Sequence, residues 1–405
     1  MKVRSRTKKK SSRIKRGLKR KTGIRSGRRA RRLKKRTPVL RRKGWLRRKR
    51  RARRKRPTPP VLAPALAETK EPVLPAALVY RGGRSMIVCT VTSASNLHRA
   101  KVMARSIKEH EPQARVVVCL VEKYVHPLAN FPYFDEVVLA KDLGVPNFPK
   151  MMFKYNVSEG TTAMKPYLLQ YAMRRYADER VFLYLDTDMR VYHPFEELFE
   201  MLEKHSILIT PHVLDQKGHN DDYLLAGIYN SGILAFTRSE ETERFLAWWG
   251  DRLYNYCYFD DKYFADQTWL DFAPVYFNAH IWRHPGYNMA VWNLMERNFT
   301  HIKNGYHYVN NRPLCIFHYS GLWGLLQKTV KECYPKSSNP MYGLLAAYEQ
   351  ELEEMGRNKA KDILWSYDFF SSNEFIEQAT KRKYKEDPGK YQDLANPFEA
   401  SNSHF

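Results

Sequence analysis

Short apolar runs rich in β-branched residues recur between residues 86 and 236, and longer amphipathic segments separate them. Such runs are typical of buried strands. The strands predicted in this way are MIVCTV (86–91), RVVVCLV (115–121), EVVLA (136–140), VFLYL (181–185), ILITP (207–211) and GILAF (232–236). Between the first two, residues 95–110 place apolar side chains at helical spacing. A strand, a helix and a strand in this order predict a parallel sheet covered by helices.

Further helices are predicted around these strands. Residues 163–177 are expected to form a helix that leads into the fourth strand. Residues 239–256 are expected to form another, because Ser239 can cap its N-terminus and acidic residues occupy its first turn. Beyond about residue 324 the pattern indicates polar helices, for example over 342–356. The chain is therefore predicted to be an α/β protein with a mostly parallel central sheet, flanking helices and a helical C-terminal extension.

Positive charge is concentrated at one end of the 405-residue chain, whose net charge is +28. Residues 1–56 hold 32 of the 70 Lys and Arg residues, and no acidic residue precedes Glu68, so the remainder has 38 basic against 42 acidic side chains. We expect residues 1–56 to be a disordered polybasic arm, because like charges repel and few apolar groups offset the entropy of ordering. A Pro/Ala-rich linker (57–78), the α/β domain (79–323) and the C-terminal extension with its polar tail (324–405) are predicted to follow.

Several classes of protein are excluded by features that the sequence lacks. No run approaches the roughly 18 to 20 apolar residues of a membrane span, and no apolar signal-peptide core follows the basic N-terminus. Cytoplasmic residence is therefore expected. The five cysteines are widely spaced without a C-x-x-C pair, which argues against a disulfide framework. Neither G-x-G-x-x-G nor G-x-x-x-x-G-K-[ST] occurs, so a dinucleotide site or a P-loop is unsupported.

Two aspartates follow the fourth predicted strand. Asp186 and Asp188 come directly after VFLYL, and side chains two positions apart on an extended chain project to the same side. Ligands of open α/β sheets bind at the carboxyl ends of strands, and paired carboxylates suit Mg²⁺ or Mn²⁺ that also contacts substrate phosphates. The pair therefore predicts a metal site, and the alternative is a turn with two solvated acids.

Three further motifs each have a functional and a structural interpretation. His318 can complete a two-aspartate metal site, or it can be a core histidine at a strand end. Asn230 and Gly232 interrupt an apolar strand, where they can contact a sugar or form a bulge. Asp266 and Gln267 lie at a predicted helix start, where the carboxylate can cap the helix or face a sugar ring.

Aromatic and polar residues gather in HPGYNMAVWN (284–293), which is predicted to be a loop. Tyr287, Asn288 and Trp292 are candidate contacts for a sugar acceptor, because aromatic faces often line sugar-binding grooves. Large aromatic side chains are also common core residues, so both interpretations stay open at this point.

The order of these motifs resembles that of glycosyltransferase family 8, which includes glycogenin and bacterial lipooligosaccharide galactosyltransferases. The series Asp-x-Asp, Asn-Ser-Gly, Asp-Gln and His-Tyr-Ser-Gly lies within residues 86–321. The resemblance implies a GT-A fold, a nucleotide-sugar donor that is UDP-linked, a divalent metal ion and retention of anomeric configuration. One segment departs from the family. After its His-x-x-Gly, the family usually has a phosphate-contacting Lys followed by Pro and Trp, whereas residues 322–326 here are LWGLL and Lys328 is displaced.

The resemblance also implies a role for each matching residue. The metal ligands are implied to be Asp186, Asp188 and His318. The donor-binding residues are implied to be Thr92, Ser93, Lys165, Asp186, Asn230 and Gly232. The pair near the reacting sugar is implied to be Asp266 and Gln267.

The expected activity is transfer of a sugar from a nucleotide-diphosphate donor to a glycan or lipid-linked acceptor, with Mn²⁺ or Mg²⁺ as cofactor. One alternative is a nucleotidyltransferase, although such enzymes typically have a Gly-rich basic loop after the first strand and TSASNLHRA (92–100) is not one. A second alternative is a catalytically inactive polyanion-binding protein. Residues 1–56 are expected to contact an anionic membrane surface, which would make the protein peripheral on the inner face, or another polyanion.

Overall fold

The computed structural model describes residues 85–215, 223–260, 262–303 and 305–405. The predictions of a polybasic arm at 1–56 and of a linker at 57–78 lie outside these residues. Within the part of the chain that the structure describes, no helix is both long and apolar enough to cross a membrane.

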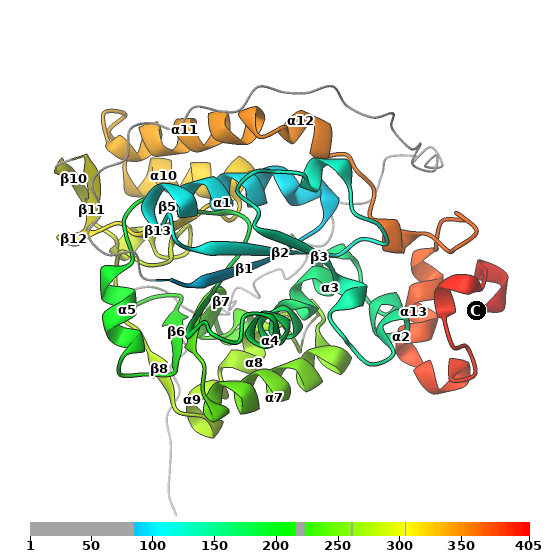
Figure 1. Ribbon diagram of the computed structural model, residues 1–405. Helices are drawn as coiled ribbons and strands as arrows, with labels where there is room; N and C mark the ends of the chain where they lie inside the picture. The colour runs from blue at the N-terminus through cyan, green and yellow to red at the C-terminus, as the bar shows by residue number, and fades with distance from the viewer. Residues whose placement is uncertain (1–84, 216–222, 261, 304) are drawn as a thin grey trace, which may run out of the picture. The chain divides into compact units, whose positions relative to one another are not determined.

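A seven-stranded sheet lies at the centre of the described chain (Figure 1). Its strands are β1 (Ile87–Thr92), β2 (Arg115–Leu120), β3 (Glu136–Leu139), β4 (Val181–Leu185), β6 (Ile207–Pro211), β7 (Tyr229–Thr237) and β8 (Ala279–Ile281). They are ordered β3-β2-β1-β4-β7-β6-β8. All neighbours pair in parallel except β7, which is antiparallel to β4 and to β6. The predicted α/β fold with a mostly parallel sheet is confirmed, and all six predicted strands are present.

Helices cover both faces of this sheet. They are α1 (Leu97–His110), α2 (Phe148–Phe153), α3 (Val157–Ala163), α4 (Lys165–Arg175), α5 (Glu196–Leu202), α6 (Tyr223–Ala226), α7 (Glu240–Tyr256), α8 (Gln267–Leu270), α9 (Ala273–Tyr276), α10 (Gln327–Cys333), α11 (Pro340–Glu354), α12 (Arg357–Ala360) and α13 (Gln378–Glu386). Alternate residues of β1 face opposite layers, as the pleat of a strand requires. Cys89 and Val91 belong to the same buried cluster as side chains of α4, whereas Val88 belongs to the cluster of Met103 and Ile107 on α1.

Two three-stranded sheets complete the described strands. The first is ordered β5-β13-β9 and consists of β5 (Met189–Val191), β13 (Ile316–His318) and β9 (Met289–Ala290). The second is ordered β10-β11-β12 and consists of β10 (Phe299–Lys303), β11 (Tyr306–Val309) and β12 (Arg312–Pro313). The first of these sheets matters for function, because β5 continues from β4 through the two aspartates and brings β13 beside them.

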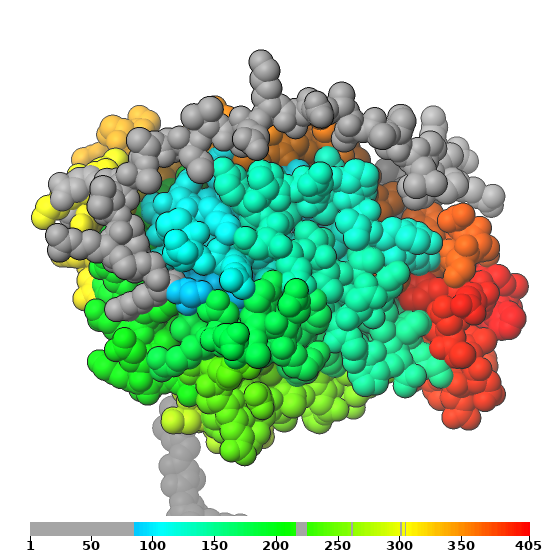
Figure 2. Space-filling view, viewed as in Figure 1, coloured from blue at the N-terminus to red at the C-terminus, as the bar shows by residue number. Residues whose placement is uncertain are grey.

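The C-terminal residues share a core with the central sheet. Trp365, Phe398 and Phe405 are buried in the same cluster as Phe153 of α2. Figure 2 shows the C-terminal segment, in red, lying against the part of the chain that contains α2 and α3. The expected helices beyond residue 324 are present as α10 to α13, and the last residues, although rich in polar side chains, contribute aromatic rings to the interior. The domain boundary placed before residue 324 stays a prediction.

Candidate active site

The segment from Asp186 to Asp188 is a turn that connects β4 to β5. Asp186 N donates a hydrogen bond to Gly232 O on β7 at 2.8 Å, and Met189 N donates to Asp186 O at 3.3 Å. The expectation of an extended backbone here is therefore wrong. The carboxylates come together because the chain turns out of the large sheet and enters the small one. Their position just after a buried strand is as predicted.

The small sheet brings His318 to these aspartates. β13 pairs antiparallel with β5 so that His318 lies opposite Met189, and Tyr319 N donates to Asp188 O at 2.8 Å. His318 Nε2 lies 3.1 Å from Asp188 Oδ1. One ligand atom from each of Asp186, Asp188 and His318 lies within 4.8 Å of the other two. Two carboxylates and an imidazole fit a divalent cation, and the nitrogen ligand favours Mn²⁺ over Mg²⁺.

A buried series of amide side chains holds the histidine. His318 Nδ1 donates to Asn288 Oδ1 at 3.2 Å, because an amide oxygen can only accept. Asn288 Nδ2 donates to Asn230 Oδ1 at 3.0 Å, and Asn230 Nδ2 donates to Gln267 Oε1 at 2.8 Å. All three amide residues are buried. In the neutral imidazole, a proton on Nδ1 leaves the lone pair of Nε2 facing the aspartates, which is the orientation that a metal ligand needs.

Gly232 allows this histidine to lie close to β7. A Cβ atom placed on Gly232 would be 2.7 Å from His318 Cε1 and 2.8 Å from Met189 Cε. A side chain at this position would therefore displace the imidazole ring. The β6–β7 pairing also changes register between Ile209 and Thr210. The bulge interpretation of Asn-Ser-Gly is thus correct, and the same irregularity places Asn230 where it supports the histidine.

Asp186 shares a buried lysine with Asp266. Lys165 Nζ lies 3.1 Å from Asp186 Oδ1 and 3.0 Å from Asp266 Oδ2, and it also donates to Ser231 Oγ at 3.1 Å. Burial opposes the charge on Lys165, but the two carboxylates outweigh burial and raise its pKa. Burial raises the pKa of Asp266, and Lys165 opposes that rise. Asp266 makes no side-chain hydrogen bond that caps α8, so its ion pair with Lys165 accounts for its place at the helix start.

A pocket of about 220 Å³ opens beside these charges at the carboxyl ends of β1 and β4. The residues of the predicted site that line it are Thr92, Ser93, Lys165, Asp186 and Asp188. The polar residues that line it without having been predicted are Asn96, Arg99, Ser158, Thr161, Thr162, Tyr184 and Thr187. Two of these contact the proposed metal ligands: Tyr184 Oη donates to Asp186 Oδ1 at 3.0 Å, and Arg99 Nη1 lies 3.2 Å from Asp188 Oδ2. Arg99 belongs to the predicted helix 95–110, and nothing in the pattern distinguishes it from a solvated helix residue.

Of the residues predicted to contact an acceptor, Tyr287 and Asn288 are buried and Trp292 is half-buried. Tyr287 is 2% exposed, and its ring centre lies 4.1 Å from that of Trp282. The Asn288 side chain is used by the amide series. The Trp292 ring meets the His318 ring edge-on, with ring centres 5.0 Å apart. These positions favour packing and support of the histidine, and an acceptor role for the three residues stays a prediction.

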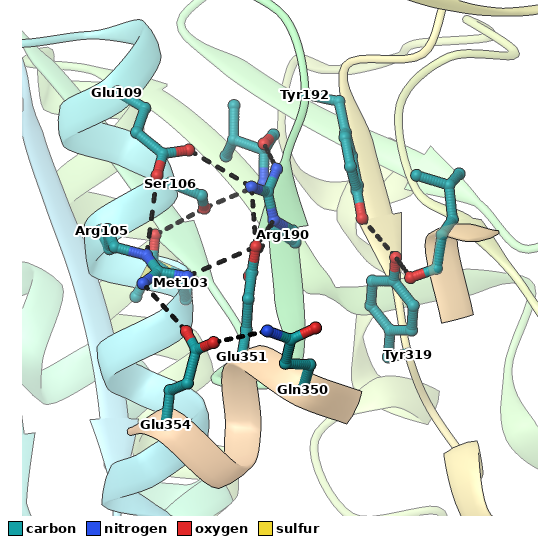
Figure 3. A network of polar contacts seen from close by, with 12 residues as sticks. Met103, Arg105, Ser106, Glu109, Arg190, Tyr192, Tyr319, Gln350, Glu351 and Glu354 are labelled. Atoms are coloured by element: carbon teal, nitrogen blue, oxygen red, sulfur yellow. Dashed lines mark hydrogen bonds and ion pairs between the residues drawn. The ribbon is translucent and has the colours of Figure 1, made fainter. Parts of the chain in front are cut away.

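Five charged residues join β5 to α1 and α11, as Figure 3 shows, and we call them the clamp: Arg105, Glu109, Arg190, Glu351 and Glu354. Arg190 Nη2 lies 3.3 Å from Glu109 Oε2, and Arg190 Nε lies 2.9 Å from Glu351 Oε2. Arg105 Nη2 lies 3.3 Å from Glu351 Oε1. Because β5 directly follows Asp188 and α1 contains Arg99, the clamp fixes two elements that build the site.

No protein-family model matches the sequence. Two proteins of Bacillus subtilis (strain 168) are similar to it. The uncharacterized protein YfnD is 22% identical over 252 residues, which are 60% of this chain and 80% of YfnD. The uncharacterized protein YfnF is 22% identical over 274 residues, which are 65% of this chain and 90% of YfnF.

Solved structures of two glycosyltransferases also resemble this chain. The galactosyltransferase LgtC, in complex with donor and acceptor sugar analogs, is 16% identical with a TM-score of 0.42, and the match covers 67% of this chain and 96% of LgtC. Mouse xyloside xylosyltransferase 1 is 14% identical with a TM-score of 0.35, and the match covers 59% of this chain and 98% of that protein. At these values the likeness assigns neither substrate nor mechanism, so the function proposed below rests on the site residues of this chain.

Proposed function

We propose that this chain is a glycosyltransferase that moves a sugar from a nucleotide-diphosphate donor, with a divalent cation bound by Asp186, Asp188 and His318. The observation that supports this most is the convergence of two carboxylates and an oriented imidazole beside a pocket at the carboxyl ends of parallel strands. The order of motifs that resembles family 8 adds a UDP-linked donor, a glycan or lipid-linked acceptor and retention of configuration to the proposal.

The proposed metal site suits a diphosphate leaving group. A divalent cation bound there would neutralise the negative charge that develops on the diphosphate as the sugar bond breaks. Lys165 holds Asp186 in place through a 3.1 Å ion pair. Thr92 and Ser93, at the end of β1, offer hydroxyl and backbone groups to the nucleoside.

Asp266 and Gln267 have different proposed roles. Both polar atoms of the Gln267 side chain are engaged, since Oε1 accepts from Asn230 Nδ2 and from Ser231 N, and Nε2 donates to Ala226 O at 2.8 Å. We assign Gln267 a positioning role through the amide series. Asp266 has one close ionic partner, Lys165, and we propose that its carboxylate stabilises positive charge on the sugar ring during transfer.

The proposal is tested by the thermal stability of the full chain with Mn²⁺ and a panel of nucleotide sugars. A ligand that binds only the folded state raises its stability by about 2.7 kcal/mol at 100 times its Kd, so the cognate donor should raise the Tm only when Mn²⁺ is present. Asp186→Asn should abolish this rise, whereas Asp362→Asn, at an exposed aspartate outside the site, should preserve it. Absence of any metal-dependent rise in the wild-type protein would contradict the proposal.

Product analysis separates sugar transfer from nucleotidyl transfer. A glycosyltransferase releases a nucleoside diphosphate from its donor, whereas a nucleotidyltransferase releases pyrophosphate. We expect nucleoside diphosphate, and its formation should stop when Mn²⁺ is chelated. Release of pyrophosphate would replace the proposed function by the nucleotidyltransferase alternative.

For residues 1–56 we propose contact with an anionic membrane surface on the cytoplasmic side, because the segment is polycationic and each Lys or Arg near such a surface contributes about 1 kcal/mol. Flotation with phosphatidylserine vesicles should recover the full chain and lose a chain that lacks residues 1–56. Equal recovery of both proteins would contradict the membrane proposal.

A further inference from the structure

The two cations that line the pocket use their hydrogen-bond donors differently. Lys165 Nζ has close partners in Asp186, Asp266 and both oxygens of Ser231, so its three protons are engaged. Arg99 has one hydrogen-bond partner among the described residues, Asp188, through Nη1. Arg99 Nε is buried without a hydrogen-bond partner in the same part of the chain. Among the described residues, the pocket is therefore lined by Lys165, whose N–H donors are all engaged, and by Arg99, whose guanidinium has N–H donors without partners.

The orientation of Arg99 is set by its surroundings and not by that single bond alone. The guanidinium carbon lies 5.5 Å from the ring centre of Trp323, and the Arg357 guanidinium carbon lies 4.0 Å from the same centre. Trp323 belongs to the irregular segment Leu322–Leu326, where Gly324 has a φ of 145°. This is the LWGLL segment, which has no lysine. Arg99 thus supplies a cation at a place where the neighbouring loop supplies none.

Asp188 divides its two oxygens between two different partners. Oδ1 lies 3.1 Å from His318 Nε2, and Oδ2 lies 3.2 Å from Arg99 Nη1. A divalent cation that binds Asp188 competes with Arg99 for this carboxylate, because each of the two positive charges is stabilised by the same negative charge. A guanidinium that loses Asp188 still requires acceptors, and phosphate oxygens match its planar set of donors.

We propose that Arg99 alternates between two anionic partners, Asp188 in the protein without donor and the diphosphate of the donor in the complex. This inference rests on the proposed function. It assigns to Arg99 two effects of opposite sign, since the guanidinium opposes binding of the metal alone and favours binding of the diphosphate once the metal is present. A residue that only supported the fold of the site would change both affinities in the same direction.

Calorimetric titration of the full chain tests both effects. In Arg99→Gln, the affinity for Mn²⁺ alone should rise about threefold or more, because a competing cation is removed from Asp188. The affinity for UDP, measured at saturating Mn²⁺, should fall about 10- to 100-fold, which is the usual contribution of a charge-assisted hydrogen bond. The affinity for uridine should change less than threefold, because uridine has no phosphate.

Two further variants separate charge from geometry. Arg99→Lys should show an intermediate loss of UDP affinity, because an ammonium retains the charge without the planar pair of donors. Arg357→Gln is the matched control, since Arg357 packs on the same Trp323 ring but does not line the pocket, and both affinities should stay within twofold of the wild-type values.

Three outcomes would overturn the inference. UDP affinity of Arg99→Gln within twofold of the wild-type value would mean that the guanidinium does not contact the diphosphate. A parallel fall in Mn²⁺ and UDP affinity would mean that Arg99 only supports Asp188. If the wild-type protein itself bound neither Mn²⁺ nor any nucleoside diphosphate, the proposed function would fail, and this inference would fail with it.

Discussion

Two ionic clusters in this protein use charged residues for different purposes. The clamp joins α1, β5 and α11, and each of its arginines lies within 4.0 Å of more than one glutamate. The pocket cluster joins Asp186, Asp188 and His318 with Lys165 and Arg99, and among the described residues guanidinium donors of Arg99 have no partner. Charge pairing is therefore common to both clusters. The pocket cluster differs because it lies beside a cavity, where a further charged ligand could complete it.

The acids of the two clusters also differ in the direction of their pKa shifts. Burial raises the pKa of Glu109 in the clamp, and Arg190 and Arg105 only partly offset it. In the pocket, burial opposes ionisation of Asp188, but His318 and Arg99 outweigh it and hold the pKa of Asp188 well below its usual range. The pocket thus keeps Asp188 ionised, as a ligand for a cation must be.

The largest expected effect comes from removing the negative charge of Asp188 in the pocket cluster. Asp188→Asn should lower kcat/KM for sugar transfer on the order of 10³-fold, because it removes a metal ligand at the site where leaving-group charge develops. Glu354→Gln, on the exposed edge of the clamp, should change kcat/KM less than twofold. Initial-rate assays with the cognate donor and Mn²⁺ measure both, and retained metal-dependent turnover in Asp188→Asn would refute the metal assignment.

Removing an arginine from the clamp should instead lower the stability of the fold. Arg190→Met leaves Glu109 and Glu351 without their shared guanidinium. Because the Arg190–Glu351 pair is largely buried, the free energy of unfolding should fall by about 3 kcal/mol. Urea denaturation measures this loss. The Mn²⁺ affinity of the folded variant should stay within about tenfold of the wild-type value. A loss below about 1 kcal/mol would show that the clamp adds little to the fold.

A smaller effect is expected from removing the hydrogen-bond partner of His318, the proposed metal ligand. Asn288→Gly removes the acceptor of the His318 Nδ1 proton, and the affinity for Mn²⁺ should fall about 10- to 100-fold. Asn288 has a φ of 59°, which glycine adopts freely and aspartate tolerates. Asn288→Asp, which retains an acceptor oxygen, should bind Mn²⁺ more tightly than Asn288→Gly. Equal Mn²⁺ affinity in the wild-type protein and in the glycine variant would exclude the amide series from metal binding.

The smallest expected effect is a dependence of stability on pH near the clamp. Burial, with Arg190 and His193, lowers the pKa of His110 to about 4, whereas the unfolded chain has a pKa near 6.5. Below pH 6.5 the unfolded state therefore takes up a proton that the folded state does not, and stability falls as the pH falls. His110→Gln should reduce the slope between pH 6.5 and 5.5 by up to about 1.4 kcal/mol per pH unit. Equal slopes of the free energy of unfolding would argue against a buried neutral His110.

Local pattern was sufficient to predict the elements that form the central sheet. The run VFLYL became β4 with every residue buried, and Ser239 accepts a hydrogen bond from Thr242 N at the start of α7. The position of Asp186 and Asp188 beside a pocket was also predictable, because ligand sites of open α/β sheets lie at the carboxyl ends of strands. Arg99 and Asn288 had no such local signal for the roles proposed here, since an arginine on a helix and an asparagine in a loop are ordinary residues.

The amino-acid sequence by itself determined which segments are buried, where the charge is concentrated and which side chains are able to bind a divalent cation, because these depend on composition and short spacing. Only the tertiary structure decided that β5 pairs with β13, which brings His318 to Asp188, and that Phe398 and Phe405 pack against Phe153. Contacts between segments so distant in the chain depend on register and on packing of the whole core. No local pattern encodes these two properties.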